Sequence, residues 1–200
     1  MEARETKEKI AEAAESVEPR GHNVASRRVG LLIAGFAALL AITEAAGKGA
    51  QTEALNANIQ ASDLWAFFQA KTIRSTTLKT AVEAETLKLG SASAEERVAA
   101  QNQIDAWNAT IARYESDPST GEGRKELTDR ATQAEHQRDQ SLSSYHLFEY
   151  GSAAFQLAIV LASAALVSGM SALVWVAIGL GGVGLLVDLL GWLAPSIFHV

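Results

Sequence analysis

The sequence lacks cysteine entirely, so none of its 200 residues can form a disulfide bond or supply a thiolate. Thiolate catalysis and zinc–thiolate sites are therefore excluded, while the redox compartment stays open. Catalytic signatures are missing as well, because the chain has no His-Glu-x-x-His, no Gly-x-Ser-x-Gly and no Ser-His-Asp arrangement. These absences predict a protein that is not an enzyme and that has no cofactor or metal site.

Positive charge is also scarce, which argues against a nucleic-acid partner. The chain has 17 Lys and Arg against 23 Asp and Glu, a formal net charge of −6. Most of the acidic excess falls in the polar middle of the chain, whereas phosphate binding needs a basic patch. We therefore expect no binding to nucleic acid.

Charge is almost absent from the C-terminal quarter. Asp188 is the one Asp, Glu, Lys or Arg in residues 151–200. This run is long enough for two membrane-spanning helices, which we expect at residues 150–170 and 172–195. Membrane lipid is therefore an expected partner.

A further apolar run lies near the N terminus and predicts another span at residues 29–46, preceded by a polar tail at residues 1–28. Its fully apolar part, Val29–Ile42, covers ~21 Å of helix against a hydrocarbon core of ~30 Å. Whether this segment crosses the membrane fully is open. Arginines 27 and 28 precede it, and positive charge at a span end favours a cytoplasmic N terminus with the polar middle outside.

The polar middle, residues 47–149, reads as a helical stalk with helices at about 50–89, 94–116 and 124–149. Ser93 with Glu96 fits a capping box at the start of the second helix, and Asp117-Pro118 to Gly123 breaks the chain. Three stripes recur at helical spacing: Ala54, Ala57, Ala61, Leu64, Phe68, Lys71, Ser75, Leu78, Val82, Glu85 and Leu89; Ala100, Ile104, Trp107, Ile111 and Tyr114; and Leu127, Ala131, Ala134, Leu142 and Tyr145.

The lengths of the three predicted helices favour one long helix, residues 50–89, with the two shorter helices running back along it one after the other. This arrangement is a coiled-coil-like antiparallel stalk. A compact three-helix bundle is the alternative. Because the stripes contain much Ala, Gln and Ser, one stalk buries little apolar area. We therefore expect an all-α membrane protein whose stalks pack against each other in a homo-oligomer.

Three acidic residues are candidates for an ion or polar cluster. With three spans, Glu44, Glu149 and Asp188 lie on the same side of the membrane, and in a symmetric oligomer they can form rings that attract cations. Asp188 is the acid placed within an apolar segment, and such acids are functional candidates. It precedes Trp192 by one helical turn, so reaching out to water at the interface is the other interpretation.

Small residues and aromatic residues point to packing. Ala154, Ala158 and Ala162 recur every four residues, as do Ala177 and Gly181, and small residues let membrane helices approach closely. In the stalk, Trp65, Phe67 and Phe68 form an aromatic cluster, which we interpret as core or inter-subunit packing, with a ligand or lipid groove as the alternative.

The segment from Thr52 to Ser75, TEALNANIQASDLWAFFQAKTIRS, resembles domain-of-unknown-function family 4337, a family of bacterial multi-pass membrane proteins. The specific part is Ser-Asp-x-Trp-Ala-x-x-Gln-Ala-Lys. The resemblance implies a bacterial inner membrane location and no catalytic activity. Family members often carry arginines between the last two spans, but this chain has Ser-Gly-Met-Ser at residues 168–171, so the resemblance adds nothing to the orientation.

If this family core marks a shared surface, its candidate residues are Asp63, Trp65, Gln69 and Lys71. Helical spacing places Asp63 and Lys71 on roughly one side of the helix and Trp65 elsewhere.

Two functions are consistent with the sequence. The first is a self-associating structural protein or an accessory subunit of a larger membrane complex. The alternative is a cation channel or ion-coupled transporter lined by Glu44, Glu149 and Asp188.

Overall fold

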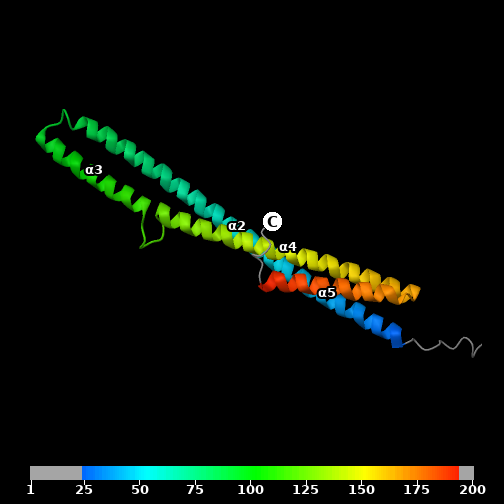
Figure 1. Cartoon of the computed structure of the whole chain (residues 1–200). Coiled ribbons are helices and arrows are strands. Elements are labelled where there is room, and N and C mark those ends of the chain that lie inside the picture. The colour runs from blue at the N-terminus through cyan, green and yellow to red at the C-terminus, as the bar shows by residue number, and fades with distance from the viewer. Residues whose placement is uncertain (1–23, 194–200) are drawn as a thin grey trace, which may run out of the picture. The chain divides into compact units, whose positions relative to one another are not determined.

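The computed structural model describes residues 24–193, and within this range the chain is all α-helical, without strands. The all-helical prediction is therefore confirmed for this part. The helices are α2 (Val24–Lys88), α3 (Ala94–Glu115), α4 (Arg124–Ser168) and α5 (Ser171–Leu193) (Figure 1). Most of the predicted N-terminal tail and the last predicted residues of the third span lie outside the described range.

The chain divides into two compact units, which we describe separately. The apolar unit comprises residues 24–48 and 144–193 of the described chain, and the polar unit comprises residues 49–143. Helices α2 and α4 contribute residues to both units.

Three of the helices are long and apolar enough to cross a membrane: α2, α4 and α5. Each overlaps one of the three predicted spans, but two of the predicted spans correspond to parts of longer helices. The first lies within α2, which begins at Val24 and continues without a break to Lys88. The second is the C-terminal part of α4, which ends at Ser168.

Small residues line much of the interior of the apolar unit, where α5 lies beside α4 and the N-terminal part of α2 (Figure 1). The Phe36 ring lies so close to Gly181 that a Cβ atom there would overlap it. Phe36 also packs on Phe155, with ring centroids 6.2 Å apart. The fully buried alanines of this unit are Ala158, Ala162 and Ala177. Close helix approach through small side chains is the usual packing mode of membrane helices.

In the polar unit, α3 and then α4 lie alongside α2 (Figure 1). One long helix is therefore paired with a broken return, rather than folded into a compact three-helix bundle. The core cluster consists of Ala61, Leu64, Leu127, Ala131 and Ala134, with Trp65, Phe67 and Phe68 packed against it. The aromatic cluster thus packs within the chain.

About half of the predicted stripe positions are buried, and the others are half-buried apart from Leu142. Buried members on α2 are Ala54, Ala57, Ala61, Leu64, Lys71 and Ser75. On α4 the prediction of Leu142 as a core position was wrong, because Leu142 is 37% exposed and Ser141 is buried in its place. The spacing explains this, since Ser141 lies seven residues after Ala134 and so continues the stripe, whereas Leu142 is one residue out of register.

Local signals define the ends of α3. Ser93 is the N-cap, and both hydrogen bonds of the capping box with Glu96 are present, as predicted. After α3 the chain turns at Gly121, whose φ of 69° favours glycine. Gly123 is required by close approach, because a Cβ atom there would overlap Glu126 and the backbone of Ser116 and Asp117.

Candidate functional site

The Asp188 carboxylate is the centre of a polar contact inside the apolar unit. Thr43 Oγ1 of α2 donates a hydrogen bond to Asp188 Oδ2 of α5. The Thr43 side chain is 2% exposed, and its Oγ1 also lies 3.0 Å from the Leu39 carbonyl oxygen. The two helices are therefore joined by a side-chain hydrogen bond within their apolar contact.

The third helix of this unit reaches the same carboxylate through a glycine. A Cβ atom at Gly151 of α4 would overlap Asp188 Oδ1 and would lie 3.3 Å from the Gly184 carbonyl oxygen. Asp188 Oδ1 is buried and has no hydrogen-bond partner among the described residues. One carboxyl oxygen is thus enclosed between α2 and α4, while the Asp188 residue as a whole is half-buried.

The other two acids of the predicted cluster do not meet Asp188 within one chain. Glu44 is exposed on α2. Glu149 is exposed on α4 and lies 3.6 Å from His146 Nδ1. A ring of acids would therefore need several copies of the chain. Within residues 24–193, no group of three or more His, Cys, Asp or Glu is placed to hold a metal ion.

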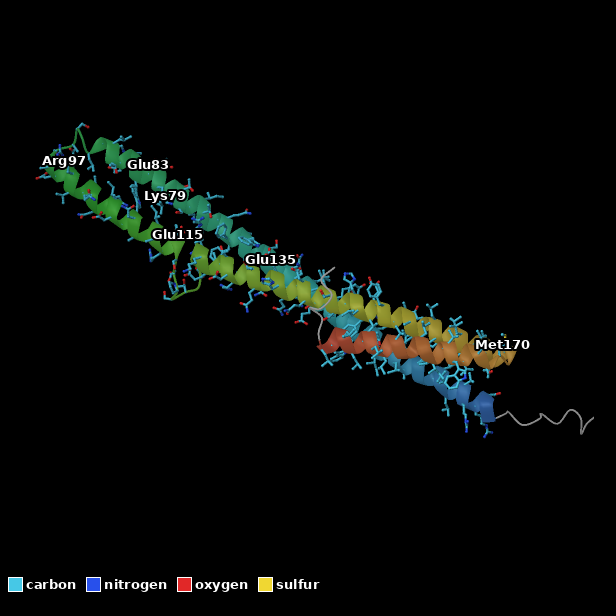
Figure 2. All side chains as sticks on the ribbon, viewed as in Figure 1. Lys79, Glu83, Arg97, Glu115, Glu135 and Met170 are labelled. Atoms are coloured by element: carbon cyan, nitrogen blue, oxygen red, sulfur yellow. The ribbon has the colours of Figure 1, made fainter. Side chains whose placement is uncertain are left out.

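In the polar unit, Trp65 joins α2 to α4. Its indole Nε1 donates a hydrogen bond of 2.9 Å to Glu135 Oε1, and Figure 2 shows Glu135 on the stretch of α4 that lies beside α2. The Trp65 ring meets the Phe68 ring edge-on, with centroids 5.5 Å apart. Trp65 therefore holds the pair of helices together.

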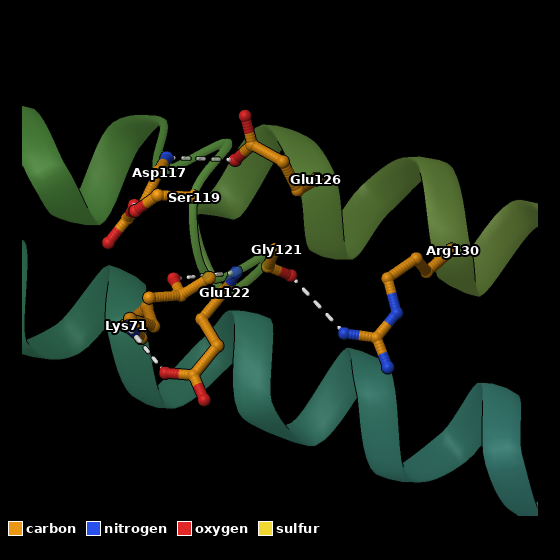
Figure 3. A network of polar contacts seen from close by, with 8 residues as sticks. Lys71, Asp117, Ser119, Gly121, Glu122, Glu126 and Arg130 are labelled. Atoms are coloured by element: carbon orange, nitrogen blue, oxygen red, sulfur yellow. Dashed lines mark hydrogen bonds and ion pairs between the residues drawn. The ribbon is translucent and has the colours of Figure 1, made fainter.

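Lys71 is buried at the point where α3 ends and α4 begins. Its Nζ lies 5.1 Å from the ring centroids of both Phe67 and Tyr114. It also lies 3.6 Å from Glu122 Oε2 in the connecting loop (Figure 3). Two aromatic faces and one carboxylate thus replace the water that an ammonium group normally requires.

The loop between α3 and α4 is fixed by further polar contacts. Glu126 accepts hydrogen bonds from the Ser116 hydroxyl at 2.6 Å and from the Asp117 amide at 3.1 Å. The Ser116 hydrogen bond lowers the pKa of Glu126 below its ordinary value. Arg130 donates to the Gly121 carbonyl oxygen at 3.2 Å (Figure 3). Side-chain hydrogen bonds therefore hold the loop between α3 and α4 in one defined conformation.

The four residues proposed as a shared surface do not lie on one face. Trp65 and Lys71 contact other residues of the same chain, whereas Asp63 and Gln69 are exposed. The prediction that Asp63 and Lys71 share one side was wrong. Their eight-residue separation leaves them about 80° apart on a helix with 3.6 residues per turn, so Lys71 can face the return helix while Asp63 faces outward.

A family comparison agrees with the resemblance seen in the sequence. The model described as Domain of unknown function (DUF4337) matches residues 25–194. The chain belongs to this family. No curated protein and no solved structure matches it. In this DUF4337 chain, the matched region therefore includes both the Asp188 contact and the Lys71 cluster.

Several residues of the two sites could not be identified from the DUF4337 sequence. Thr43 and Gly151 are unremarkable among many alanines, glycines and threonines, and only folding brings them to Asp188. Tyr114 and Lys71 each belong to a predicted stripe. Because the stripes were expected to pack against each other, a contact between these two residues is consistent with the sequence. Glu122 and Glu135 carried no signal, because acidic residues are common throughout the polar middle of the chain.

Proposed function

We propose that this DUF4337 protein is a non-enzymatic, self-associating membrane protein, acting as a structural element or as an accessory subunit of a larger membrane complex. Copies are proposed to associate through one exposed face of α2 in the polar unit. The observation that carries this proposal is a regular, largely uncharged stripe on that face.

We call this stripe the outer seam. Its residues follow alternating steps of four and three along α2, and every one of them is exposed. They are Leu55, Ile59, Ser62, Ala66, Gln69, Ile73, Thr76, Thr80, Glu83 and Leu87. On a heptad wheel the outer seam lies roughly opposite the stripe that packs on α3 and α4.

The composition of the outer seam supports burial. Glu83 is its one charged member, and Leu55, Ile59, Ile73 and Leu87 are each more than half exposed. The threonines add apolar surface, because the Oγ1 atoms of Thr76 and Thr80 bond carbonyl oxygens of α2 itself at 3.0 and 3.1 Å. Their hydroxyl groups are satisfied, so burying them leaves no unpaired donor.

A second copy of α2 in parallel orientation is the proposed occupant. Copies inserted in one membrane by the same spans share an orientation, so equivalent residues can face each other. Ile59 and Ile73 lie at outer-seam positions equivalent to the a sites of a heptad, where a β-branched residue favours two-stranded parallel pairing. A strip ~48 Å long and ~10 Å wide would bury about 1,000 Å² between two copies, which is near the lower limit for a specific interface.

The proposed location is a bacterial inner membrane, crossed by α2, α4 and α5, with the N terminus cytoplasmic and the polar unit outside. The three apolar helices support the membrane itself. Arg27 and Arg28 in the first turns of α2 support the orientation. Labelling of a Gln60→Cys variant in intact cells by a membrane-impermeant maleimide tests it, because only an outward polar unit is labelled.

Cysteine cross-linking tests the proposed self-association cleanly, since the chain has no cysteine of its own. Ile59→Cys places a thiol on the outer seam, and Gln60→Cys places one on the adjacent position outside it, which is also exposed. Under mild oxidation in the native membrane, we expect a covalent dimer for Ile59→Cys only, because disulfide formation requires Cα atoms within ~7 Å. Equal cross-linking of both variants, or of neither, would contradict the proposal.

Native mass spectrometry then distinguishes a structural homo-oligomer from an accessory subunit of a larger complex. Only integer multiples of 21.2 kDa are expected for a homo-oligomer that acts alone. Additional masses that persist in mild detergent identify an accessory subunit and its partner.

A cation channel or ion-coupled transporter is the second candidate, favoured by the inward Asp188 carboxylate with its unpartnered Oδ1. Ion flux into liposomes is the direct test, with Asp188→Asn as the comparison. Flux that is absent, or that is unchanged in Asp188→Asn, would contradict this candidate.

A further inference from the structure

Asp188 is a titratable residue that is not part of the outer seam proposed for self-association. It is the one charged residue of α5 and is half-buried, with its Oδ1 atom enclosed against Gly151 of α4. Three helices meet at this group, because Thr43 of α2 donates to it and Gly151 of α4 lies against it.

No counter-charge faces this carboxylate among the described residues. From α2 the facing group is the neutral Thr43 hydroxyl, and the next residue, Glu44, is exposed. From α4 the facing group is Gly151, while Glu149 pairs with His146. None of the ion pairs within residues 24–193 includes Asp188.

The two carboxyl oxygens have different surroundings, and the difference suits a carboxylic acid. Oδ2 accepts the Thr43 hydrogen bond, whereas the buried Oδ1 has no partner within the described chain. The Gly184 carbonyl oxygen borders the same position beside Gly151. An ionised Oδ1 would be buried without a hydrogen-bond donor, whereas protonation removes the charge from this apolar surrounding.

We propose that Asp188 is a proton-binding site, holding its proton as a neutral carboxylic acid at neutral pH. An ionised carboxylate enclosed by apolar helices without a cation or a full set of hydrogen bonds is costly, and binding a proton removes that cost. The proton is the ligand, and Thr43, Gly151 and Gly184 shape its site. This proposal does not depend on association through the outer seam.

A protonated carboxyl inside an apolar unit is a substrate for a membrane-soluble carbodiimide. The acid O–H adds across one C=N bond of the reagent, so that the carboxyl oxygen bonds to carbon and the proton moves to nitrogen. No group leaves, and the protein gains the whole mass of the reagent. An ionised carboxylate brings no proton to this addition and reacts slowly.

The test is labelling of the full chain in lipid nanodiscs with dicyclohexylcarbodiimide at neutral pH, followed by peptide mass spectrometry. We expect one adduct on Asp188, none in Asp188→Asn, and a labelling rate at least tenfold higher than at Glu44 or Glu149. Labelling should fall as the pH rises far enough to remove the proton. An Asp188 that stays unlabelled, or that reacts no faster than these exposed glutamates, would overturn the proposal.

Infrared spectroscopy gives a readout that does not depend on reagent access. The difference spectrum of the parent chain minus Asp188→Asn should contain the carbonyl band of a protonated acid, shifted in D₂O. Carboxylate bands in its place would mean an ionised Asp188 and would overturn the proposal. Thr43→Val, which keeps the shape but removes the hydroxyl donor, should retain the acid band at a slightly higher frequency.

Discussion

The indole nitrogen of Trp65 and a carboxylate oxygen of Glu135 lie 2.9 Å apart, although seventy positions separate the two residues in the chain. This hydrogen bond ties α2 to α4 beside the small alanine-rich core of the polar unit. Most side chains of that core are alanines, so it buries little apolar area. Each polar contact therefore contributes a larger share of the stability than it would in a domain with a large hydrophobic core.

Replacing Trp65 by Phe should therefore lower the stability of the polar unit. The charge-assisted hydrogen bond to Glu135 is lost, and we expect a decrease of about 1–2 kcal/mol in the free energy of local opening. Native-state hydrogen exchange of the α2 amides in detergent micelles measures it. In a double-mutant cycle with Glu135→Ala, the two changes should be non-additive, and strict additivity would contradict the coupling.

Gly151→Ala should destabilise the apolar unit. The added methyl group would overlap the Asp188 carboxylate, and such overpacking costs about 1–3 kcal/mol. Thermal unfolding of the purified protein, followed by circular dichroism, should show a lower Tm. The matched control is Gly182→Ala in α5, where nothing lies within 4 Å. An equal decrease in both variants would show that the carboxylate contact is not responsible.

Lys71→Met should loosen the connection between α3 and α4. The substitution keeps a flexible apolar stem but removes the ammonium group from Phe67, Tyr114 and Glu122. We expect a loss of about 1 kcal/mol and faster proteolysis at residues 116–123. Lys79→Met, at an exposed position of α2, is the control. If proteolysis is equally slow in both variants, Lys71 does not hold the loop.

Acid should weaken the same connection through Glu126. The Ser116 hydrogen bond lowers the pKa of Glu126 from an ordinary value of 4.5. A carboxyl group with a lower pKa in the folded state stabilises the fold above its unfolded pKa. That contribution is lost as the pH falls from about 4.5 through the folded value.

Hydrogen exchange of residues 116–127 between pH 6 and pH 3 measures this loss, after correction for the intrinsic effect of pH on exchange. Glu126→Gln should flatten the pH dependence, whereas Asp129→Asn, at an exposed position of α4, should leave it intact. A pH dependence that persists in Glu126→Gln would assign it to another group, such as Asp117, whose pKa Ser119 lowers.

Elements that depend on neighbouring residues alone could be predicted from the sequence. Hydropathy identified three apolar segments because a helix that crosses a membrane must present a continuous run of apolar side chains to the lipid. The three-and-four spacing of Ala54 to Ser75 identified the buried face of α2, since helical periodicity alone decides which residues share a side. Ser93 and Glu96 marked a helix start because a capping box involves only neighbouring residues.

Tertiary structure decided which helices meet and which side chains they bring together. Sequence spacing placed Glu44, Glu149 and Asp188 on one side of a membrane, but only the packing of α2, α4 and α5 turns Asp188 toward Thr43 and Gly151 and leaves the glutamates exposed. Counting residues gives the depth of a side chain along a span, because the rise per residue of a helix is constant. The direction in which a side chain points across a helix contact depends on where small residues allow close approach.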